Sequence, residues 1–412
     1  MAETTPDIAS LCSWLDASPT PFHVVATARD ILLRDGFKEH RTLADGVAQR
    51  GFHVLDGAIV AWSVGTAGAP LRIVGAHTDS PNLRVQPNPD IVTQGWAQLG
   101  IEIYGGVLLN SWLDRDLGLA GRVVGPDGSV TLFDAGVPLA RVPQLAIHLD
   151  REINDRGLVL DRHQHTVPVW GVNAPTFAEW LSGLTGVSRV AAFDAHLYDV
   201  QKASLLGNDG AFLVSGRLDN QLSCWAAINA LVGTRSSHTC IAILNDHEEV
   251  GSDSVTGAGG PLLENVVSLI LAAQGLSEGQ RFDMLRESWC LSADNAHAVH
   301  PNYRERHESR HSPLPNEGVA LKVNGNQRYA TSARGAAHLR QVAENARVPL
   351  QTFVSRNNMP CGSTIGPITA TRLGIEAIDV GVPQLSMHSA REMCGSSDPS
   401  HLLGLVSAFF AA

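Results

Sequence analysis

The stretch Ile-Leu-Asn-Asp-His-Glu-Glu-Val-Gly-Ser, "ILNDHEEVGS" at residues 243–252, decides how this chain is interpreted. An apolar run at 241–244 predicts a buried strand. Four polar residues follow it almost at once: Asp246, His247, Glu248 and Glu249. Neighbouring carboxylates at the end of a core strand repel one another unless a cation lies between them or one of them holds a proton. The stretch leaves both explanations open, and the rest of the sequence decides between them.

The composition is that of a globular chain. Its 412 residues are 44% hydrophobic and 17% charged, which predicts two or three domains with ample core. The formal net charge of -11 argues against nucleic acid as a partner, because nucleic-acid binding requires a basic face. An acidic surface by itself identifies no other partner.

The cysteines and the apolar segments indicate the compartment. The six cysteines are scattered without a CxxC pair, which favours reduced, buried thiols and a reducing environment. The N-terminal sequence has no basic region followed by an apolar core, so we expect no signal peptide. The most apolar helical segment, 262–273, is short and contains Glu264, so we expect no membrane span. A cytoplasmic protein is predicted.

The pattern of elements predicts an α/β chain with an insertion. Helical spacing appears at 6–16 and 21–35, with Thr20 as an N-cap, and a buried strand follows at 71–77. From residue 84 to about 208 the chain carries short strand patterns and turn signals, such as the hairpin at 121–133.

Strands and helices alternate again after the insertion. We expect strands at 210–216, 240–245, 288–293, 318–323, 350–354 and 375–380, and helices at 220–232, 261–273, 333–346 and 398–411. Such alternation predicts a mixed sheet covered by helices on both faces. The predicted catalytic domain is discontinuous, 1–83 and 209–412, and the inserted β-rich domain is 84–208.

Polar residues follow five predicted strands, where sites in open α/β sheets gather. They are His77, Asp219, Glu248 with Glu249, Asp294, and His388. Nitrogen and oxygen donors without thiolates suit zinc, cobalt or manganese in a catalytic role. Five ligands exceed one tetrahedral site but fit two ions that share a carboxylate at about 3.5–4 Å separation. One glutamate can then bind metal while its neighbour accepts a proton from water.

Each of these residues alone has a structural explanation. A histidine at a strand end is commonly a hydrogen-bonded core residue, and a Glu-Glu pair is commonly a solvated face. Asp219 precedes a predicted helix and can be an N-cap. Their coincidence at five strand ends favours a metal site.

The sequence resembles the aspartyl aminopeptidases, the M18 family of dizinc metallopeptidases. The resemblance rests on seven motifs in the family's order: "GAHTDSPNLRV" (75–85), "SGRLDNQLSC" (215–224), "NDHEEVGS" (245–252), "SADNAHAVHPNY" (292–303), "KVNGNQRYA" (322–330), "MPCGSTIGPI" (359–368) and "MHSAREM" (387–393). It spans nearly the whole chain. It implies a zinc-peptidase-like catalytic domain and an inserted dimerisation domain.

The resemblance implies two zinc ions per subunit, for which Co²⁺ or Mn²⁺ can substitute. Asp219 is expected to bridge both ions. His77 and Asp294 are expected to complete the first site, and Glu249 and His388 the second. A trio of His77, His148 and His388 is an alternative ligand set.

The resemblance also implies the catalytic and substrate-binding residues. Glu248 is expected to be the general base that later returns the proton to the leaving amine, and Asp79 is expected to orient the ring of His77. Three further residues are implied as substrate contacts: His148, His297 and Lys322. His148 is expected to reach the active site of a neighbouring subunit.

The implied activity is an aminopeptidase that removes unblocked N-terminal Asp or Glu from peptides, with Lys322 as the cation of the side-chain pocket. A broader specificity stays open. The family further implies dimers through the inserted domain and a tetrahedral dodecamer.

Three alternatives remain beside this interpretation. A thiol mechanism through Cys361 is disfavoured once the metal ligands are assigned. A carboxypeptidase or deacylase on the same scaffold would require an arginine that holds a substrate carboxylate beside the metals. A non-catalytic chaperone or scaffold would keep the metal without a rate, and the intact Glu248 argues against it.

Overall fold

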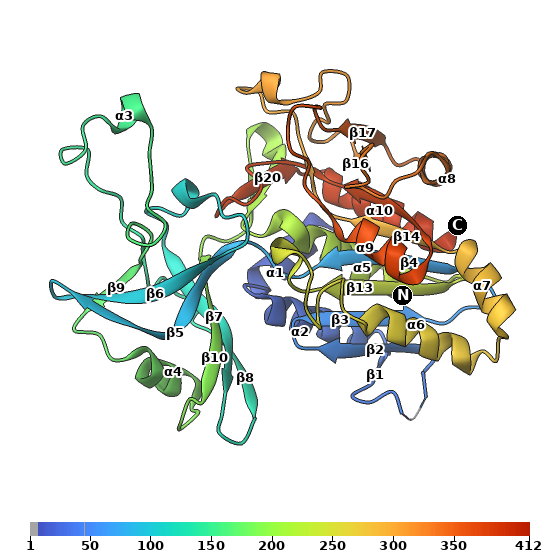
Figure 1. Cartoon of the computed structure of the whole chain (residues 1–412), viewed down its shortest axis with the longest axis horizontal. Helices are drawn as coiled ribbons and strands as arrows, with labels where there is room; N and C mark the ends of the chain where they lie inside the picture. Colours follow the sequence, from blue (N-terminus) through green and yellow to red (C-terminus); the bar gives the residue numbers. More distant parts are fainter. Residues whose placement is uncertain (1–6, 45) are drawn as a thin grey trace.

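The protein is described here by a computed structural model that covers residues 7–44 and 46–412. Segments from both ends of the sequence, blue and red in Figure 1, form one part of the molecule. The middle of the sequence, cyan and green, forms the other part beside it (Figure 1).

The larger part is built on a nine-stranded mixed sheet. Strands β13, β4, β14 and β18 run parallel to one another at its centre, and β3 and β16 join this group antiparallel. In spatial order the strands are β1 (Lys38–Glu39), β2 (Arg50–Leu55), β3 (Ala58–Ser63), β13 (Thr239–Asn245), β4 (Leu71–His77), β14 (Trp289–Ala293), β18 (Glu376–Gly381), β16 (Val319–Val323) and β17 (Leu350–Val354).

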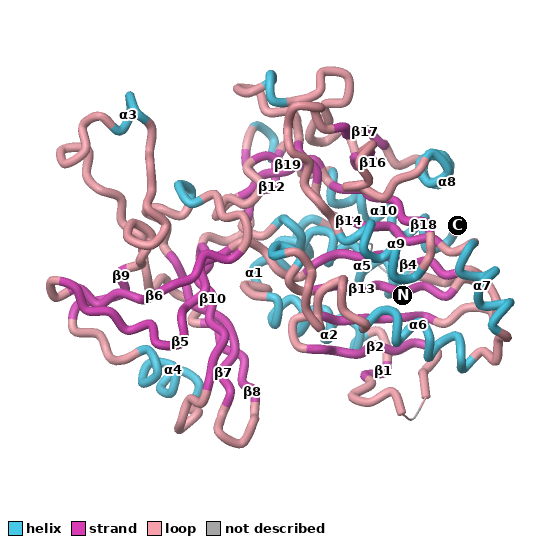
Figure 2. Tube along the Cα trace, in the orientation of Figure 1, coloured by secondary structure: helices cyan, strands magenta, loops and turns pink. Residues whose placement is uncertain are grey.

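Helices cover both faces of this sheet, as Figure 2 shows. One face is packed by α1 (Ile8–Ala17), α2 (Pro21–Arg34), α5 (Leu218–Gly233), α8 (Ala333–Ala346) and α10 (Asp398–Ala411). The other is packed by α6 (Leu262–Ala273), α7 (Glu278–Arg286) and α9 (Ile365–Leu373). The mixed α/β fold predicted from the sequence is confirmed.

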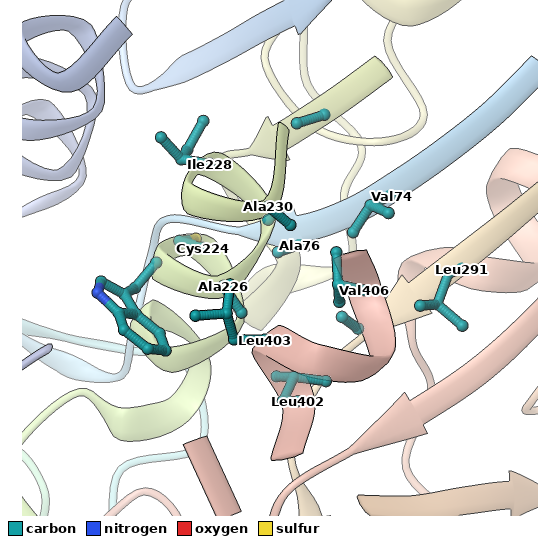
Figure 3. Close-up of a cluster of buried hydrophobic side chains, with 14 of the residues drawn as sticks. Val74, Ala76, Cys224, Ala226, Ile228, Ala230, Leu291, Leu402, Leu403 and Val406 are labelled. Atoms are coloured by element: carbon teal, nitrogen blue, oxygen red, sulfur yellow. The ribbon is translucent and has the colours of Figure 1, made fainter. Parts of the chain in front are cut away.

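The central strands are apolar along their whole length because both of their faces are buried. In β13, Ala242 and Leu244 join the core beneath α5 and α10, whereas Ile241 and Ile243 join the core beneath α6. Figure 3 shows the first of these cores, with side chains of β4, α5 and α10 in contact. Each buried aliphatic side chain contributes about 1.5–3 kcal/mol to folding, so the sheet provides a rigid support for the residues at its strand ends.

A six-stranded antiparallel sheet forms the second part of the molecule. In spatial order its strands are β8 (Val130–Asp134), β7 (Leu117–Val124), β10 (Ala192–Asp199), β5 (Asn82–Thr93), β6 (Trp96–Tyr104) and β9 (Val169–Val172). Helix α4 (Phe177–Thr185) packs on it through Phe177 and Leu181, and the short α3 (Ile153–Arg156) lies in the long connection between β8 and β9. This part therefore has its own apolar core.

A third sheet of five short strands lies next to the main one. Its order is β11 (Ser204–Leu206), β12 (Phe212–Ser215), β20 (Glu392–Gly395), β19 (Pro383–Leu385) and β15 (Ala296–His297). Four 3₁₀ turns complete the elements: η1 (Leu109–Ser111), η2 (Asn208–Gly210), η3 (Glu248–Val250) and η4 (Arg304–Arg306). Polar residues near the ends of β12 and β19 therefore come from a different sheet than those of β4, β13 and β14.

Most of the expected elements form within a few residues of their predicted bounds. Position 6 of the first expected helix lies outside the described residues. Thr20 occupies the N-cap of α2, but its hydroxyl bonds to Nδ1 of His23 instead of capping a backbone N–H. The hairpin of β2 and β3 and the helix α7 were not expected. Only Met284 of helix α7 is buried, so this helix needs no apolar stripe and its sequence has little amphipathic pattern.

The structure also answers two smaller questions from the sequence. All six cysteines are free thiols, and four of them are buried. Within residues 7–44 and 46–412, no helix is long and apolar enough to cross a membrane.

Candidate active site

Parallel pairing brings the first two candidate ligands together. His77 is the last residue of β4, and Asp294 follows the last residue of the neighbouring β14. Both side chains are buried, and Nε2 of His77 lies 3.7 Å from Oδ1 of Asp294. The carboxyl ends of adjacent parallel strands meet at one edge of the sheet, so this proximity follows directly from the topology.

Asp219 lies between two histidines. It is the second residue of α5, where the chain leaves the short third sheet, and its peptide bond to Asn220 is cis. Its Oδ1 lies 3.4 Å from Nε2 of His77, and its Oδ2 lies 3.5 Å from Nε2 of His388. One buried carboxylate therefore presents one oxygen to each imidazole.

The two glutamates of the opening stretch occupy the turn η3 after β13. His247 has a left-handed backbone conformation with φ of 62°, which turns the chain at the strand end. Glu249 then reaches His388, with Oε2 3.4 Å from Nε2. Glu248 lines the same cavity without making that contact. The adjacent glutamates thus have different surroundings.

Both histidines are held in the tautomer that frees Nε2. Nδ1 of His77 is 3.0 Å from the backbone carbonyl of Asp79, and Nδ1 of His388 is 3.1 Å from that of Gly106. A hydrogen on each Nδ1 donates to these oxygens and leaves the Nε2 lone pair directed at the carboxylates. Metal-binding histidines are commonly oriented in this way.

The separations fit a metal ion. Donors around a tetrahedral zinc with bonds of about 2.0–2.1 Å lie about 3.3 Å apart, close to the 3.4–3.7 Å distances between the facing nitrogen and oxygen atoms. His77, Asp219 and Glu249 each present a ligand atom within 4.8 Å of the other two. Asp219 Oδ1 and Glu249 Oε1 are buried without a hydrogen-bond partner. These orphaned oxygens and the nitrogen–oxygen donor set fit zinc.

The site by itself concentrates negative charge. Burial raises the pKa of Glu248 to about 8, and the carboxylates of Asp294 and Asp79 add to this rise against the opposing effect of His77. Burial alone would lower the pKa of His388, but Asp219 and Glu249 outweigh it and raise the pKa to about 10. Burial is the leading cause of the higher pKa of Glu248, whereas neighbouring carboxylates cause the higher pKa of His388. A bound cation would offset the charge of these carboxylates.

Asp79 holds parts of the site in place although it does not line the cavity. Its carboxylate is fully buried and accepts the backbone N–H groups of Glu248 and Glu249, each at 3.1 Å, and the Tyr104 hydroxyl at 2.7 Å. Burial alone would raise the pKa of Asp79, but its bonds to His77 and Tyr104 outweigh burial, and the pKa lies below the ordinary value. Asp79 therefore stays ionised and fixes both the His77 ring and the turn η3.

A cavity of about 400 Å³ opens onto the predicted ligands and the expected substrate contacts His297 and Lys322. Lys322 is 2% exposed, and its Nζ donates to the backbone carbonyls of Asp294 at 2.8 Å and Asn295 at 3.2 Å. Residues 362–364 of the quoted motif "MPCGSTIGPI" also line the cavity. Thr364 is the N-cap of α9, although its hydroxyl donates to Asp379.

Two sequence candidates lie away from this cluster. His148 is exposed in the long connection after β8 and does not line the cavity, so the alternative trio with His77 and His388 is not assembled within the described chain. Cys361 lies beside the loop at 362–364, where its sulfur accepts a hydrogen bond from Ser355. No histidine is shown to contact its thiol among the described residues.

Sequence reasoning missed several residues that hold the ligands. Glu392 accepts the backbone N–H groups of Asp219 at 2.9 Å and His388 at 2.7 Å. Tyr104 and Gly106 reach the site from the second sheet. Glu392 belongs to a motif quoted above, so its position was a usable signal, whereas the bonds of Tyr104 and Gly106 depend on how the two parts pack.

The fold and the donors thus define a metal-dependent enzyme centre, and comparison with known proteins specifies the class. The family model described as Aminopeptidase I zinc metalloprotease (M18) matches residues 14–410. The probable M18 family aminopeptidase 2 of Streptomyces coelicolor is 48% identical over 415 residues, covering 97% of this chain and 96% of that protein. The chain belongs to the M18 aminopeptidase family, a family of zinc metalloproteases.

Solved structures agree with this assignment. A chain in the cryo-EM structure of the Ape4 and Nbr1 complex is 35% identical and has a TM-score of 0.92, covering 98% of this chain and 85% of that chain. A chain of the S. cerevisiae mApe1 dodecamer is 27% identical and has a TM-score of 0.85, covering 98% of this chain and 96% of that chain. The fold around the candidate site is therefore the fold of M18 aminopeptidases.

We expect zinc to stabilise the protein through Asp219. A ligand that binds only the folded state adds about 2.7 kcal/mol to the free energy of unfolding when it is present at 100 times its Kd. Zinc should therefore raise the Tm of metal-free protein. Asp219→Asn should lose most of this rise because a neutral amide offsets less charge. Asp209→Asn, an exposed position in η2, is the matched control, and thermal melts with and without zinc provide the measurement. An equal rise in both variants would contradict the assignment.

Proposed function

We propose that this M18 aminopeptidase removes N-terminal residues from peptides at a two-zinc site bridged by Asp219. One observation carries the proposal: the two carboxylate oxygens of Asp219 face two different histidines at 3.4 and 3.5 Å. His77 and Asp294 complete the first site. Glu249 and His388 complete the second. A carboxylate shared in this way is the usual bridge of two-metal hydrolases.

The chemistry divides between the metals and the protein. Bound zinc acts as a Lewis acid toward the scissile carbonyl and makes water acidic near neutral pH. Glu248 accepts a proton from the attacking water at its carboxylate and delivers it to the departing amine. Its backbone N–H is fixed by Asp79 at 3.1 Å, and its side chain lines the cavity. Glu248 is thus placed to move a proton while its neighbour binds metal.

Glu248→Gln is expected to lower kcat by about 10²- to 10⁴-fold, the usual contribution of a general base, because an amide cannot accept the proton. Its zinc content should stay at the wild-type level. Glu249→Gln should instead lose zinc, since it removes a ligand at the adjacent position. Steady-state kinetics and elemental analysis of both variants separate these roles. Wild-type kcat for Glu248→Gln would exclude it as the base.

We further propose a preference for unblocked N-terminal Asp or Glu. Lys322 is the one lysine or arginine that lines the cavity among the described residues. Its Nζ already donates to two carbonyls and lies 3.6 Å from Oδ2 of Asp294, so its charge is held in a fixed place. A cation that lines the cavity can form a charge-assisted hydrogen bond with an acidic substrate side chain, which an apolar or basic side chain cannot form.

Dipeptides that differ only in an N-terminal Asp, Glu, Leu or Lys test this preference. We expect kcat/KM to be highest for Asp and Glu. Lys322→Gln should lower the Asp-to-Leu ratio by about 10- to 100-fold, since a hydrogen bond to a charged group contributes about 1.5–3 kcal/mol. Lys202→Gln, at an exposed lysine, is the control. Faster cleavage of Leu by the wild-type enzyme would contradict the acidic pocket.

We also propose that residues 84–208 are a dimerisation domain inserted into a catalytic domain of residues 1–83 and 209–412, and that dimers assemble into a dodecamer. Exposed apolar side chains support a contact surface on the insertion: Leu145 at 60%, Leu149 at 74% and Val159 at 83%. His148 is exposed within this region, and we propose that it approaches a partner's active site. The related mApe1 is a dodecamer.

Light scattering of the purified protein tests the assembly. The mass should correspond to a dodecamer, and Leu149→Asp should lower it by placing a charge in an apolar contact. A wild-type protein that is monomeric at micromolar concentration would contradict the proposal.

A further inference from the structure

The end of strand β6 enters the candidate active site from the other part of the molecule. Tyr104 is the last residue of β6, and the backbone from Tyr104 to Leu108 continues past the turn η3 and His388. We call this stretch the 104–108 segment. It belongs to the inserted sheet and makes specific bonds to groups of the catalytic centre.

At one end the segment holds Asp79. The Tyr104 hydroxyl donates to Oδ2 of Asp79 at 2.7 Å, and the same carboxylate accepts the N–H groups of Glu248 and Glu249. The Arg84 guanidinium lies over the Tyr104 ring, 3.5 Å from its centre, and so packs against the face of the ring. Tyr104 is only 7% exposed. Its hydroxyl therefore has a defined position and a single direction for its hydrogen.

In the middle the segment holds His388. The carbonyl oxygen of Gly106 accepts from Nδ1 of His388 at 3.1 Å, and the N–H of Leu108 donates to the His388 carbonyl at 3.0 Å. A methyl group on Gly106 would lie 2.9 Å from Nδ1 of His388. The ring therefore packs directly against the Gly106 backbone, and its orientation depends on the absence of a side chain there.

These contacts reach both halves of the proposed metal site. Asp79 orients His77, which faces Asp294, and the segment itself orients His388, which faces Glu249. Neither Tyr104 nor Gly106 is a proposed metal ligand. Tyr104 acts through Asp79, and Gly106 acts through His388.

We propose that Tyr104 and Gly106 are positioning residues of the metal centre, so that the inserted sheet is a structural part of each active site as well as a dimerisation element. The inference rests on the proposed ligand set. It implies that the catalytic part of the chain has a lower zinc affinity without the contacts from the insertion.

Tyr104→Phe tests the first contact, because it removes one hydroxyl and keeps the ring. We expect zinc affinity, measured by competition with a chromophoric chelator, to fall by about 10- to 100-fold, as is usual when a group supporting a ligand is lost. With zinc saturating, kcat should fall while KM stays near its wild-type value. The matched control is Tyr198→Phe in β10, whose hydroxyl donates to Asp134 at 2.5 Å and makes no bond to Asp79 or to a proposed ligand.

Gly106→Ala tests the second contact. The added methyl group should displace the His388 ring and weaken zinc binding to a similar extent. Gly183→Ala in helix α4 of the same part is the matched control, since a methyl group there meets nothing within 4 Å. Circular dichroism and Tm values of the four variants show whether the fold is kept.

The outcomes separate this inference from the proposed function. If Glu248→Gln is inactive but Tyr104→Phe and Gly106→Ala bind zinc as their controls do, the positioning roles are wrong and the proposed function stands. If the wild-type protein, saturated with zinc, cleaves none of the four dipeptides, the proposed function fails. If Tyr104→Phe lowers Tm as much as Tyr198→Phe does and leaves zinc affinity unchanged, its role is structural only. A loss of zinc affinity confined to Tyr104→Phe and Gly106→Ala supports the inference.

Discussion

The structure depends on the carboxylates gathered around Asp219. Asp294, Glu248 and Glu249 converge on the same buried region, where their charges repel and water can solvate them only in part. Two histidines face them, and Lys322 lies at the edge of the cluster, 3.6 Å from Asp294. Such a group is stable only when bound cations or protons neutralise it and when the scaffold holds each carboxylate in place. The first condition explains why a core strand ends in adjacent glutamates, and the second explains most of the polar contacts around the site.

Three sets of contacts hold the carboxylates in place. A parallel sheet with apolar cores on both faces fixes the strand ends that carry His77 and Asp294. Buried carboxylates behind the ligands then hold the irregular backbone: Asp79 binds the turn that carries Glu248 and Glu249, and Glu392 binds the N–H groups of Asp219 and His388. The inserted sheet contributes the third set of contacts, through Tyr104 and Gly106. The groups around the candidate site thus come from residues that are distant in sequence and lie in or next to three different sheets.

The sequence predicted what depends on local pattern. Apolar runs followed by polar residues identified the strand ends that carry His77, Asp219 and Glu249, and the α/β alternation predicted a sheet covered on both faces. The sequence did not predict the hydrogen bond from Tyr104 to Asp79. That bond joins residues from two different sheets, and the periodicity of a sequence does not show how two sheets pack together. The same holds for Lys322 of β16, whose depth and two carbonyl partners depend on residues that follow β14, two strands away in the sheet. His148 shows a related limit: it is exposed on the insertion, and the role proposed for it requires a second subunit.

The most direct test is a crystal structure of the zinc-loaded protein with anomalous diffraction data on both sides of the zinc absorption edge. The account predicts two zinc peaks about 3.5–4 Å apart, one beside His77 and Asp294, the other beside Glu249 and His388, with Asp219 between them. A single peak at full zinc saturation, or a second peak remote from Asp219, would contradict it.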